Sequence, residues 1–433
     1  MTQISIRSEL LLNRQKAELN HNITTLKKED VMSHNTFAAA NPVAARLAST
    51  PTFRFLATCL VFLVLSQLPA YADHIHHLWY NNSNWQDVDL TTLTNGGIAT
   101  PYGAIAAFYT TPNKQLHVYY VDNNAQHLHQ LYYNGKSWSD DDLTSYTGGP
   151  TASPYGVSGF AVGNLQYIFY IGTDNHVHET YYNNYDWTDQ DLTNLSGGPS
   201  AGFGPVLAFD TKPNLEGHVY YQDQNFDLHQ IYFNGTSWSD SDLSAALGAQ
   251  CYADWIAGFA VQNQQHVFCA GYGGYSSNLD LLHLYYNNSS WVYEDATFLS
   301  GIDTPMNLGA GIAAFKVPNA NQFEVYSVTD DTHFNRYYHV VKPKQWIDRD
   351  LTSAIGAPTD AQYGGIVAFA TTPNDQYHIY YAPSTEVYQI YYNGTAWAID
   401  DLTNGAGQAD DNSGMAGFAI GNLQHVFYMS YGN

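Results

Sequence analysis

A tryptophan recurs seven times along the chain, at intervals of 49 to 55 residues. The seven are Trp85, Trp138, Trp187, Trp238, Trp291, Trp346 and Trp397. Four residues after each one stands an aspartate: Asp89, Asp142, Asp191, Asp242, Asp295, Asp350 and Asp401. Self-similarity at this period indicates an array of equivalent structural units.

Each unit contains four short segments with the character of β-strands. In one unit, segments 103–108 (GAIAAF), 116–122 (LHVYYVD) and 127–133 (HLHQLYY) precede the segment that begins at Trp138. Asn-Gly joins the third segment to the fourth, which is typical of a tight hairpin in which both turn positions need positive φ. Four strands in each of seven units predict an all-β fold, a seven-bladed β-propeller with four antiparallel strands per blade.

The ends of the repeat region predict how the ring closes. The region begins with a third strand (74–80) and a fourth strand, and it ends with a first strand (415–420) and a second strand (424–430). We expect the N- and C-terminal strands to share one blade, because this closure leaves only short, protected strand edges.

The residues before the repeats indicate export. Residues 55–68 form an apolar run, and Ala70-Tyr71-Ala72 follows it as a small-residue cleavage pattern. We therefore divide the chain into an N-terminal extension (1–54, a leader or disordered), a signal-peptide region with its cleavage site (55–72) and the propeller (73–433). A membrane anchor is the alternative, but the run is short for a spanning helix. The predicted product is secreted, extracellular or periplasmic, with no stable membrane insertion after cleavage.

The charge balance limits the classes of partner. The chain carries a formal net charge of −24, and residues 73–433 hold 35 acidic side chains against 8 Lys and Arg. Such a surface repels nucleic acid. Cys251 and Cys269 are the only cysteines of 73–433, and export would allow them to pair, although their spacing does not require it.

Polar residues recur beside the tryptophans. The second strand carries His117, His218, His266, His378 and His425, with Tyr167 and Glu324 in the other two units. At one aligned place the third strand carries Gln130, Glu179, Gln230, His283, Asn335, Gln389 and His77. An aromatic face with nearby hydrogen-bonding groups suits a sugar ring. The alternative is that the tryptophans are hydrophobic spacers between blades and that the histidines bond across strands.

The block 116–138 (LHVYYVDNNAQHLHQLYYNGKSW) resembles the repeat of the fucose-specific lectin-like β-propellers of fungi and bacteria. In that family a strand of the form x-Arg-Val-Tyr-Tyr is followed by Ile-x-Glu and a Gly-x-Trp segment, and the Arg, the Glu and an aromatic residue hold the sugar between blades. The resemblance covers nearly all of 73–433, and seven-bladed bacterial lectins are similar in style. Two departures stand out: histidine occupies the arginine place, and the best-known fungal members have six blades.

Carried over to this chain, the resemblance implies a multivalent, secreted lectin for fucosylated glycans. The implied sugar-binding residues are Trp85, Trp138, Trp187, Trp238, Trp291, Trp346, Trp397, His117, His218, His266, His378, His425, Gln130, Glu179, Gln230 and Gln389.

The repeated aspartates and the His-x-His pairs have structural and metal-binding interpretations. We expect each aspartate to cap the turn into the next blade by accepting backbone N–H groups; calcium binding, best at 140–142, is the alternative. The pairs His74/His76, His127/His129 and His176/His178 suit zinc or copper. Their repetition instead favours a solvated strand face, so we predict no metal and no cofactor.

Enzyme motifs are missing from the sequence. The chain has no G-x-S-x-G, no H-E-x-x-H, no Gly-rich phosphate loop and no C-x-x-C. We therefore predict a lectin without catalytic residues; a protein-interaction or adhesion scaffold is the alternative, and a glycoside hydrolase is less favoured. The unit that contains Trp346 is the least regular, with Glu324, Asp330, Asp331, His333 and Arg336, and it is where we expect any unique function.

Overall fold

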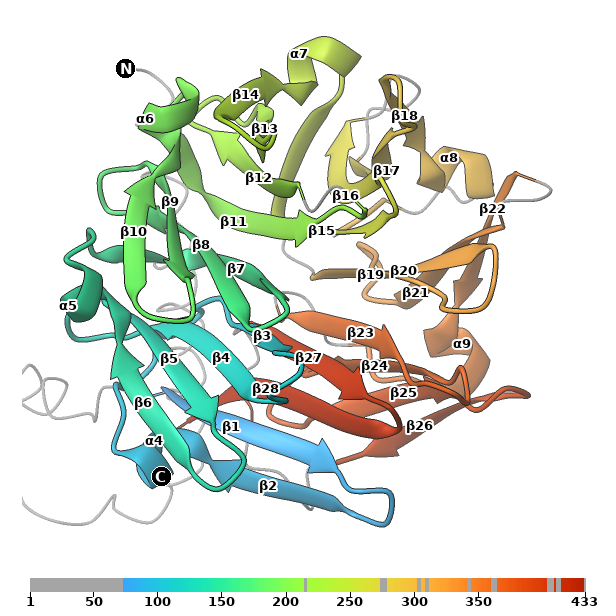
Figure 1. Cartoon of the computed structure of the whole chain (residues 1–433). Helices are drawn as coiled ribbons and strands as arrows, with labels where there is room; N and C mark the ends of the chain where they lie inside the picture. The colour runs from blue at the N-terminus through green and yellow to red at the C-terminus, as the bar shows by residue number, and fades with distance from the viewer. Residues whose placement is uncertain are drawn as a thin grey trace, which may run out of the picture. The chain divides into compact units, whose positions relative to one another are not determined.

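The computed structural model describes residues 73–433, apart from gaps at 214–215, 273–278, 302–304, 308–310, 341–343, 360–363, 403–408, 410–413 and 432–433. The segments 1–54 and 55–72 lie outside the described residues, so their assignments stay predictions. The described strands form seven four-stranded antiparallel sheets (Figure 1). The predicted propeller is therefore confirmed.

We number the sheets as blades 1 to 7, each written from its innermost strand outward. Blade 1 contains β27 (Met415–Ile420), β28 (Leu423–Tyr431), β1 (Asp73–Tyr80) and β2 (Trp85–Asp89). Blade 2 contains β3 (Ala106–Tyr109), β4 (Leu116–Val121), β5 (Leu128–Tyr133) and β6 (Trp138–Asp142). Blade 3 contains β7 (Ala152–Val162), β8 (Leu165–Gly172), β9 (Val177–Tyr182) and β10 (Trp187–Asp191).

The remaining blades repeat this order. Blade 4 contains β11 (Ala201–Asp210), β12 (Gly217–Asp223), β13 (Leu228–Phe233) and β14 (Trp238–Asp242). Blade 5 contains β15 (Gln250–Val261), β16 (Gln264–Tyr272), β17 (Leu279–Tyr286) and β18 (Trp291–Asp295). Blade 6 contains β19 (Ile312–Lys316), β20 (Gln322–Val328), β21 (Phe334–Val340) and β22 (Gln345–Asp350). Blade 7 contains β23 (Ile366–Ala370), β24 (Tyr377–Tyr381), β25 (Tyr388–Tyr392) and β26 (Trp397–Asp401).

The innermost strands close a ring. Each of β3, β7, β11, β15, β19 and β23 contacts the innermost strand of the next blade, and β27 contacts β3. In blade 1 the N-terminal β1 pairs with the C-terminal β28, with His77 opposite Phe427. Figure 1 shows the blue N-terminal strands beside the red C-terminal ones. The predicted sharing of one blade by the two ends is confirmed.

The hydrophobic core of the described residues is divided among the interfaces between neighbouring blades. One cluster joins Val118 and Leu131 of blade 2 to Ile75 and Phe427 of blade 1. Equivalent clusters lie between the other blades. Each sheet buries both of its faces against the neighbouring blades. Successive side chains of a strand therefore point in turn to the blade on one side and the blade on the other, rather than to core and solvent.

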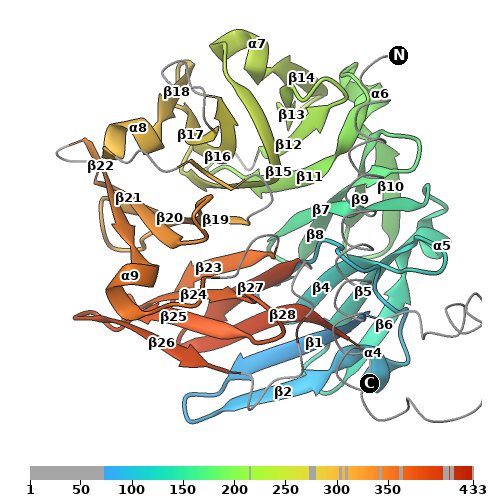
Figure 2. The same cartoon turned by 180° about the vertical axis from the view of Figure 1, so that it is seen from behind.

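Each repeated aspartate ends an outermost strand, and six of the seven begin a one-turn helix at the outer rim of the blades (Figures 1 and 2); the segment 403–408 after Asp401 lies outside the described residues. The helices are α4 (Leu90–Thr94), α5 (Leu143–Thr147), α6 (Leu192–Ser196), α7 (Leu243–Leu247), α8 (Ala296–Ser300) and α9 (Leu351–Ile355). Each has its aspartate as N-cap; the Oδ1 of Asp142, for example, accepts from the backbone N–H of Ser145 at 2.8 Å. The capping role is confirmed for Asp89, Asp142, Asp191, Asp242, Asp295 and Asp350.

The hairpin loops differ from the predicted two-residue turn. Tyr133 pairs with Trp138, so the loop has four residues, and only its second residue, Gly135, has positive φ (92°). Asn134 instead uses its side-chain oxygen to accept from the backbone N–H groups of Lys136 (2.9 Å) and Ser137 (3.1 Å). Both residue types were correctly assigned to a turn, but asparagine is there for its side chain.

Cys251 of β15 and Cys269 of β16 form a disulfide in the buried interface between blades 4 and 5. The pairing that the sequence left open is therefore present. In the described part of the chain, no helix has the length and apolar character needed to cross a bilayer.

Candidate functional site

The seven tryptophans lie where one blade meets the blade before it. Each is the first or second residue of its outermost strand, and several place the ring edge-on against a ring of the preceding blade. Trp85 contacts Tyr380 at 5.9 Å between centroids, and Trp138 contacts Phe427 at 6.2 Å. Trp346 and Trp397 are buried, whereas the other five are half-buried. The tryptophans are thus inter-blade spacers, and most keep part of the ring accessible.

Three of the inter-blade positions are closed by the same buried hydrogen-bond network. At the boundary of blades 2 and 3, Gln130 Nε2 lies 2.8 Å from each of three acceptors, His117 Nδ1, Tyr119 Oη and Gln166 Oε1, which share its two N–H groups. Tyr119 also donates to Gln166, which belongs to the next blade. The same network recurs as His218, Gln230, Tyr220 and Gln265, and as His378, Gln389, Tyr380 and Gln424. We call these the closed interfaces.

The closed interfaces account for most of the polar residues predicted to bind sugar. Burial lowers the pKa of His117 to about 3 and that of His218 and His378 to about 4, so these rings are neutral acceptors for the glutamine amide. His266 and His425 are also buried, and each is hydrogen-bonded to a third-strand histidine, His283 (2.9 Å) and His77 (3.0 Å) respectively. Sugar contact by these groups stays a prediction, while their contacts in the structure hold blades together.

Blade 6 breaks this pattern with a charged pair. In blade 2, Tyr133 lies opposite Trp138, and Gln130 is three residues before Tyr133. In blade 6, His339 lies opposite Trp346. The residue three positions before His339 is Arg336, so Arg336 and not Asn335 occupies the place of Gln130. The predicted alignment of Asn335 was wrong because β21 and β22 pair for one residue beyond the tryptophan, through Val340 and Gln345. Counting back from the turn therefore misses the arginine by one position.

Arg336 and Glu324 form a bidentate ion pair. The Nε and Nη2 atoms of Arg336 donate to Oε2 and Oε1 of Glu324, each at 2.6 Å. Glu324 is fully buried, and its burial raises its pKa while the arginine opposes that shift. Burial lowers the pKa of Arg336, but the hydrogen bonds that it donates to Glu324 outweigh this effect and the net shift is upward. The guanidinium carbon lies 4.0 Å from the centroid of the Tyr338 ring and 5.2 Å from that of Trp397.

A pocket of about 250 Å³ opens over this pair, between blades 6 and 7. Its lining residues are Gln322, Arg336, Tyr338 and Arg349 of blade 6 and Tyr377, Tyr392 and Trp397 of blade 7. Aromatic faces can stack on the C–H face of a sugar, and the guanidinium and amide can bond its hydroxyls. Of this set, the sequence prediction contained Trp397 as a ligand and pointed to Arg336 only through the irregular unit. The other five residues were missed.

The boundary of blades 3 and 4 also differs from the closed interfaces. Glu179 is the glutamate at the family's Glu place; it is buried, it accepts from Gln190 Nε2, and burial raises its pKa to about 7. Gly217 stands where the closed interfaces have Gln166, Gln265 and Gln424. Gly217 has no side chain that could extend toward Trp238. A Cβ atom added to Gly217 would lie 3.8 Å from the Trp238 ring.

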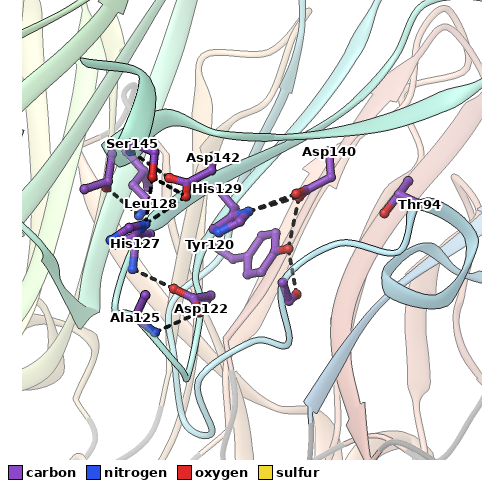
Figure 3. Close-up of polar contacts among 12 residues, drawn as sticks. Thr94, Tyr120, Asp122, Ala125, His127, Leu128, His129, Asp140, Asp142 and Ser145 are labelled. Carbon is purple, nitrogen blue, oxygen red and sulfur yellow. Dashed lines mark hydrogen bonds and ion pairs between the residues drawn. The ribbon is translucent and has the colours of Figure 1, made fainter. Parts of the chain in front are cut away.

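The His-x-His faces are only partly solvated, because each histidine packs against an aspartate of the outermost strand. His127 donates to Asp142 (2.8 Å) and His129 to Asp140 (3.0 Å), as Figure 3 shows. Among the described residues, Asp174, His176 and Asp191 have donor atoms within 4.8 Å of one another, close enough to share a metal ion. The contact of His176 with Asp191 repeats that of His127 with Asp142, and the repetition gives it a structural role.

Comparisons with known proteins give a family match over part of the chain and likenesses to solved lectin structures. Residues 45–200 match the family model described as fungal fucose-specific lectin. No curated protein matches the chain by sequence. The BP39L lectin from Burkholderia pseudomallei is 17% identical, with a TM-score of 0.55 over 76% of this chain and 97% of that chain. The lectin of Aleuria aurantia, described as a six-bladed β-propeller with a novel fucose recognition mode, is 14% identical, with a TM-score of 0.48 over 69% and 95%.

The first of these likenesses supports the fold, and the family match covers the first three tryptophan segments of the repeat. The chain is thus a seven-bladed propeller whose repeats resemble those of the fucose-specific lectin-like propellers, with a match to the fungal fucose-specific lectin family over residues 45–200.

Proposed function

We propose that the propeller is a non-catalytic carbohydrate-binding protein whose best-formed sugar site is the pocket between blades 6 and 7. The observation that carries the proposal is the Arg336–Glu324 pair beneath an aromatic-lined pocket. Fucosylated glycans are the proposed ligands, because the matched family is described as fucose-specific. The lectin-like repeat that this chain resembles also holds its sugar with an Arg, a Glu and an aromatic residue.

The geometry gives each group a role. Glu324 occupies two of the five N–H donors of Arg336 and fixes the plane of the guanidinium, which leaves three donors for sugar oxygens. Trp397 provides an apolar face beside them. Relative to the family pattern the two charged residues have exchanged strands, since the glutamate is on the second strand (β20) and the arginine on the third (β21). The exchange keeps both groups at the same inter-blade position.

The ring can carry more than one site. The boundary of blades 3 and 4, with Glu179 and Trp238, is the second position that we propose, because Gly217 leaves it without the glutamine that seals the closed interfaces. Two or more weak sites on one rigid ring gain avidity on a dense glycan surface.

Replacing Trp397 with Ala is expected to weaken binding of a fucosylated glycan about tenfold or more, because a central aromatic contact typically contributes more than 1 kcal/mol. A glycan array on the purified protein identifies the ligand, and titration calorimetry measures the loss. Trp291→Ala is the matched control, since Trp291 holds the same place beside the closed interface of Tyr220. An array without any hit, from folded protein, would exclude the lectin proposal.

We also propose that the protein is exported. The buried disulfide between Cys251 and Cys269 supports this, because such bonds persist in oxidising compartments. The N-terminus of the protein recovered outside the cell is expected to be Asp73, which is also the first residue of β1. Mass spectrometry of the N-terminal peptide decides the matter; recovery inside the cell with residues 55–72 intact would contradict the proposal.

A further inference from the structure

Residues 73–433 contain only two arginines, and both line the pocket between blades 6 and 7. They are Arg336 and Arg349, which are cross-strand partners on β21 and β22. Side chains directly opposite each other on antiparallel strands lie on the same face, and like charges there repel. The formal net charge of the chain is −24, yet both arginines of residues 73–433 lie on the same face of one blade.

The two arginines are not in the same electrostatic state. Arg336 is neutralised by its bidentate contact with Glu324. Arg349 is exposed, and within the described part of the chain no carboxylate lies within ion-pair distance of it. The lining of the pocket contains no acidic side chain. The pocket therefore keeps one uncompensated positive charge.

No other blade has a cation at the place of Arg349. The residues paired with the equivalents of Arg336 are Val88, Asp141, Gln190, Ser241, Glu294 and Asp400. Three of these are acidic and would repel an anion. The positive charge is thus a feature of the pocket between blades 6 and 7 and not of the repeat.

We propose that this pocket selects a saccharide that bears an anionic substituent, a carboxylate or a sulfate, which Arg349 binds while Arg336 and Trp397 hold the sugar ring. The inference rests on the proposed lectin function and names the ligand class of the same site. A planar guanidinium matches a carboxylate or an oxyanion with two parallel hydrogen bonds, which a neutral sugar hydroxyl does not offer.

The test compares three probes by calorimetry: methyl α-fucoside, a sulfated fucoside and a methyl uronide. Each is titrated into the wild-type protein, Arg349→Gln and Lys136→Gln. Lys136 is exposed on a hairpin of blade 2, so its variant makes the same change of net charge away from the pocket. We expect at least one anionic probe to bind the wild type about tenfold more tightly than the neutral fucoside. Arg349→Gln should abolish that preference.

The outcomes separate the two proposals. A preference that Arg349→Gln removes and Lys136→Gln retains supports the inference, and the better of the two anionic probes identifies the source of the charge. Equal binding of neutral and anionic probes, unchanged in Arg349→Gln, overturns the inference while the lectin function stands. Failure of every probe and of the glycan array overturns both.

Discussion

Acidification from pH 7 to about pH 4 is expected to unfold the propeller, because eight of its described histidines are held neutral by burial. They are His77, His117, His218, His266, His283, His339, His378 and His425, and the pKa of each is lowered in the folded protein. In the unfolded chain the same rings take up a proton near pH 6.5. The unfolded state therefore binds more protons below that pH, and stability falls as the pH falls.

The size of the effect follows from the folded pKa values. A shift from 6.5 to about 4, as for His218, corresponds to about 3 kcal/mol once the pH is below both values. A few such groups equal the usual stability of a domain, about 5–15 kcal/mol. We therefore expect a steep transition with a midpoint between about pH 4.5 and 6.

The paired histidines do not offset this loss. Burial lowers the pKa of His129 and His178, but Asp140 and Asp189 outweigh it and raise both. That stabilisation is fully present below pH 6.5 and is lost only as the pH rises through the raised values. Asp142, with a lowered pKa, loses its contribution only below its ordinary value of 3.8. Neither group changes the slope between pH 6.5 and 4.5. Buried carboxyls act in the opposite direction: burial raises the pKa of Glu179 and of Asp348 to about 7, so both take up a proton in the folded state first and offset part of the loss. The eight histidines outnumber them, so the net change on acidification is a loss of stability.

Tryptophan fluorescence during a pH titration measures the transition. His218→Gln is expected to move the midpoint to lower pH, because it removes one proton-binding site of the unfolded state. His333→Gln is the matched control, since the contact of His333 with Asp350 raises its pKa. A protein that stays folded at pH 4, or equal shifts in the two variants, would contradict this account.

Glu324→Gln is expected to cost about 3–5 kcal/mol of stability and to weaken sugar binding at the pocket of blades 6 and 7. The substitution leaves the buried Arg336 without its counter-charge, which is the costly way to break a buried ion pair. Urea denaturation gives the free energy of unfolding, and calorimetry gives the binding.

The chain offers its own rescue of that variant. The double variant Glu324→His with Arg336→Gln rebuilds the neutral pair of His117 and Gln130 in blade 2. It should recover most of the lost stability without recovering sugar binding. If Glu324→Gln alone is as stable as the wild type, Arg336 is compensated by other groups and our assignment of the pair is wrong.

The sequence predicted the fold well because its determinants are local and repeated. Trp138 and Asp142 mark one outermost strand from end to end, and six further copies confirm the reading. The incomplete units at 74–80 and 415–430 predicted the closure. A repeat pattern does not predict irregular strand pairing. The extra pair of Val340 with Gln345 shifted the predicted alignment by one residue, so that Asn335 was assigned the place that Arg336 holds.

The site was harder to predict because its groups meet only when blades pack. Gln166 seals an interface with Gln130 across 36 residues, and no pattern within one unit reveals that contact. Polar repetition was interpreted as ligand chemistry, and the repeat pattern did not reveal that in three blades the same groups form hydrogen bonds between neighbouring strands and blades. Tyr377 and Tyr392 join Arg349 in one pocket, although they come from different units.

Because blade 1 is built from both ends of the chain, it can form only after the C-terminal strands have been synthesised. His77 of β1 contacts His425 of β28 across 348 residues, so β1 must wait for nearly the whole chain before its partner exists. Until then Ile75 and Leu78, both fully buried in the finished ring, lack the β28 side chains that cover them. The pairing of β1 with β28 therefore carries the largest entropy cost of loop closure among the strand pairings. A chain truncated before Leu423 lacks β28 and cannot complete blade 1.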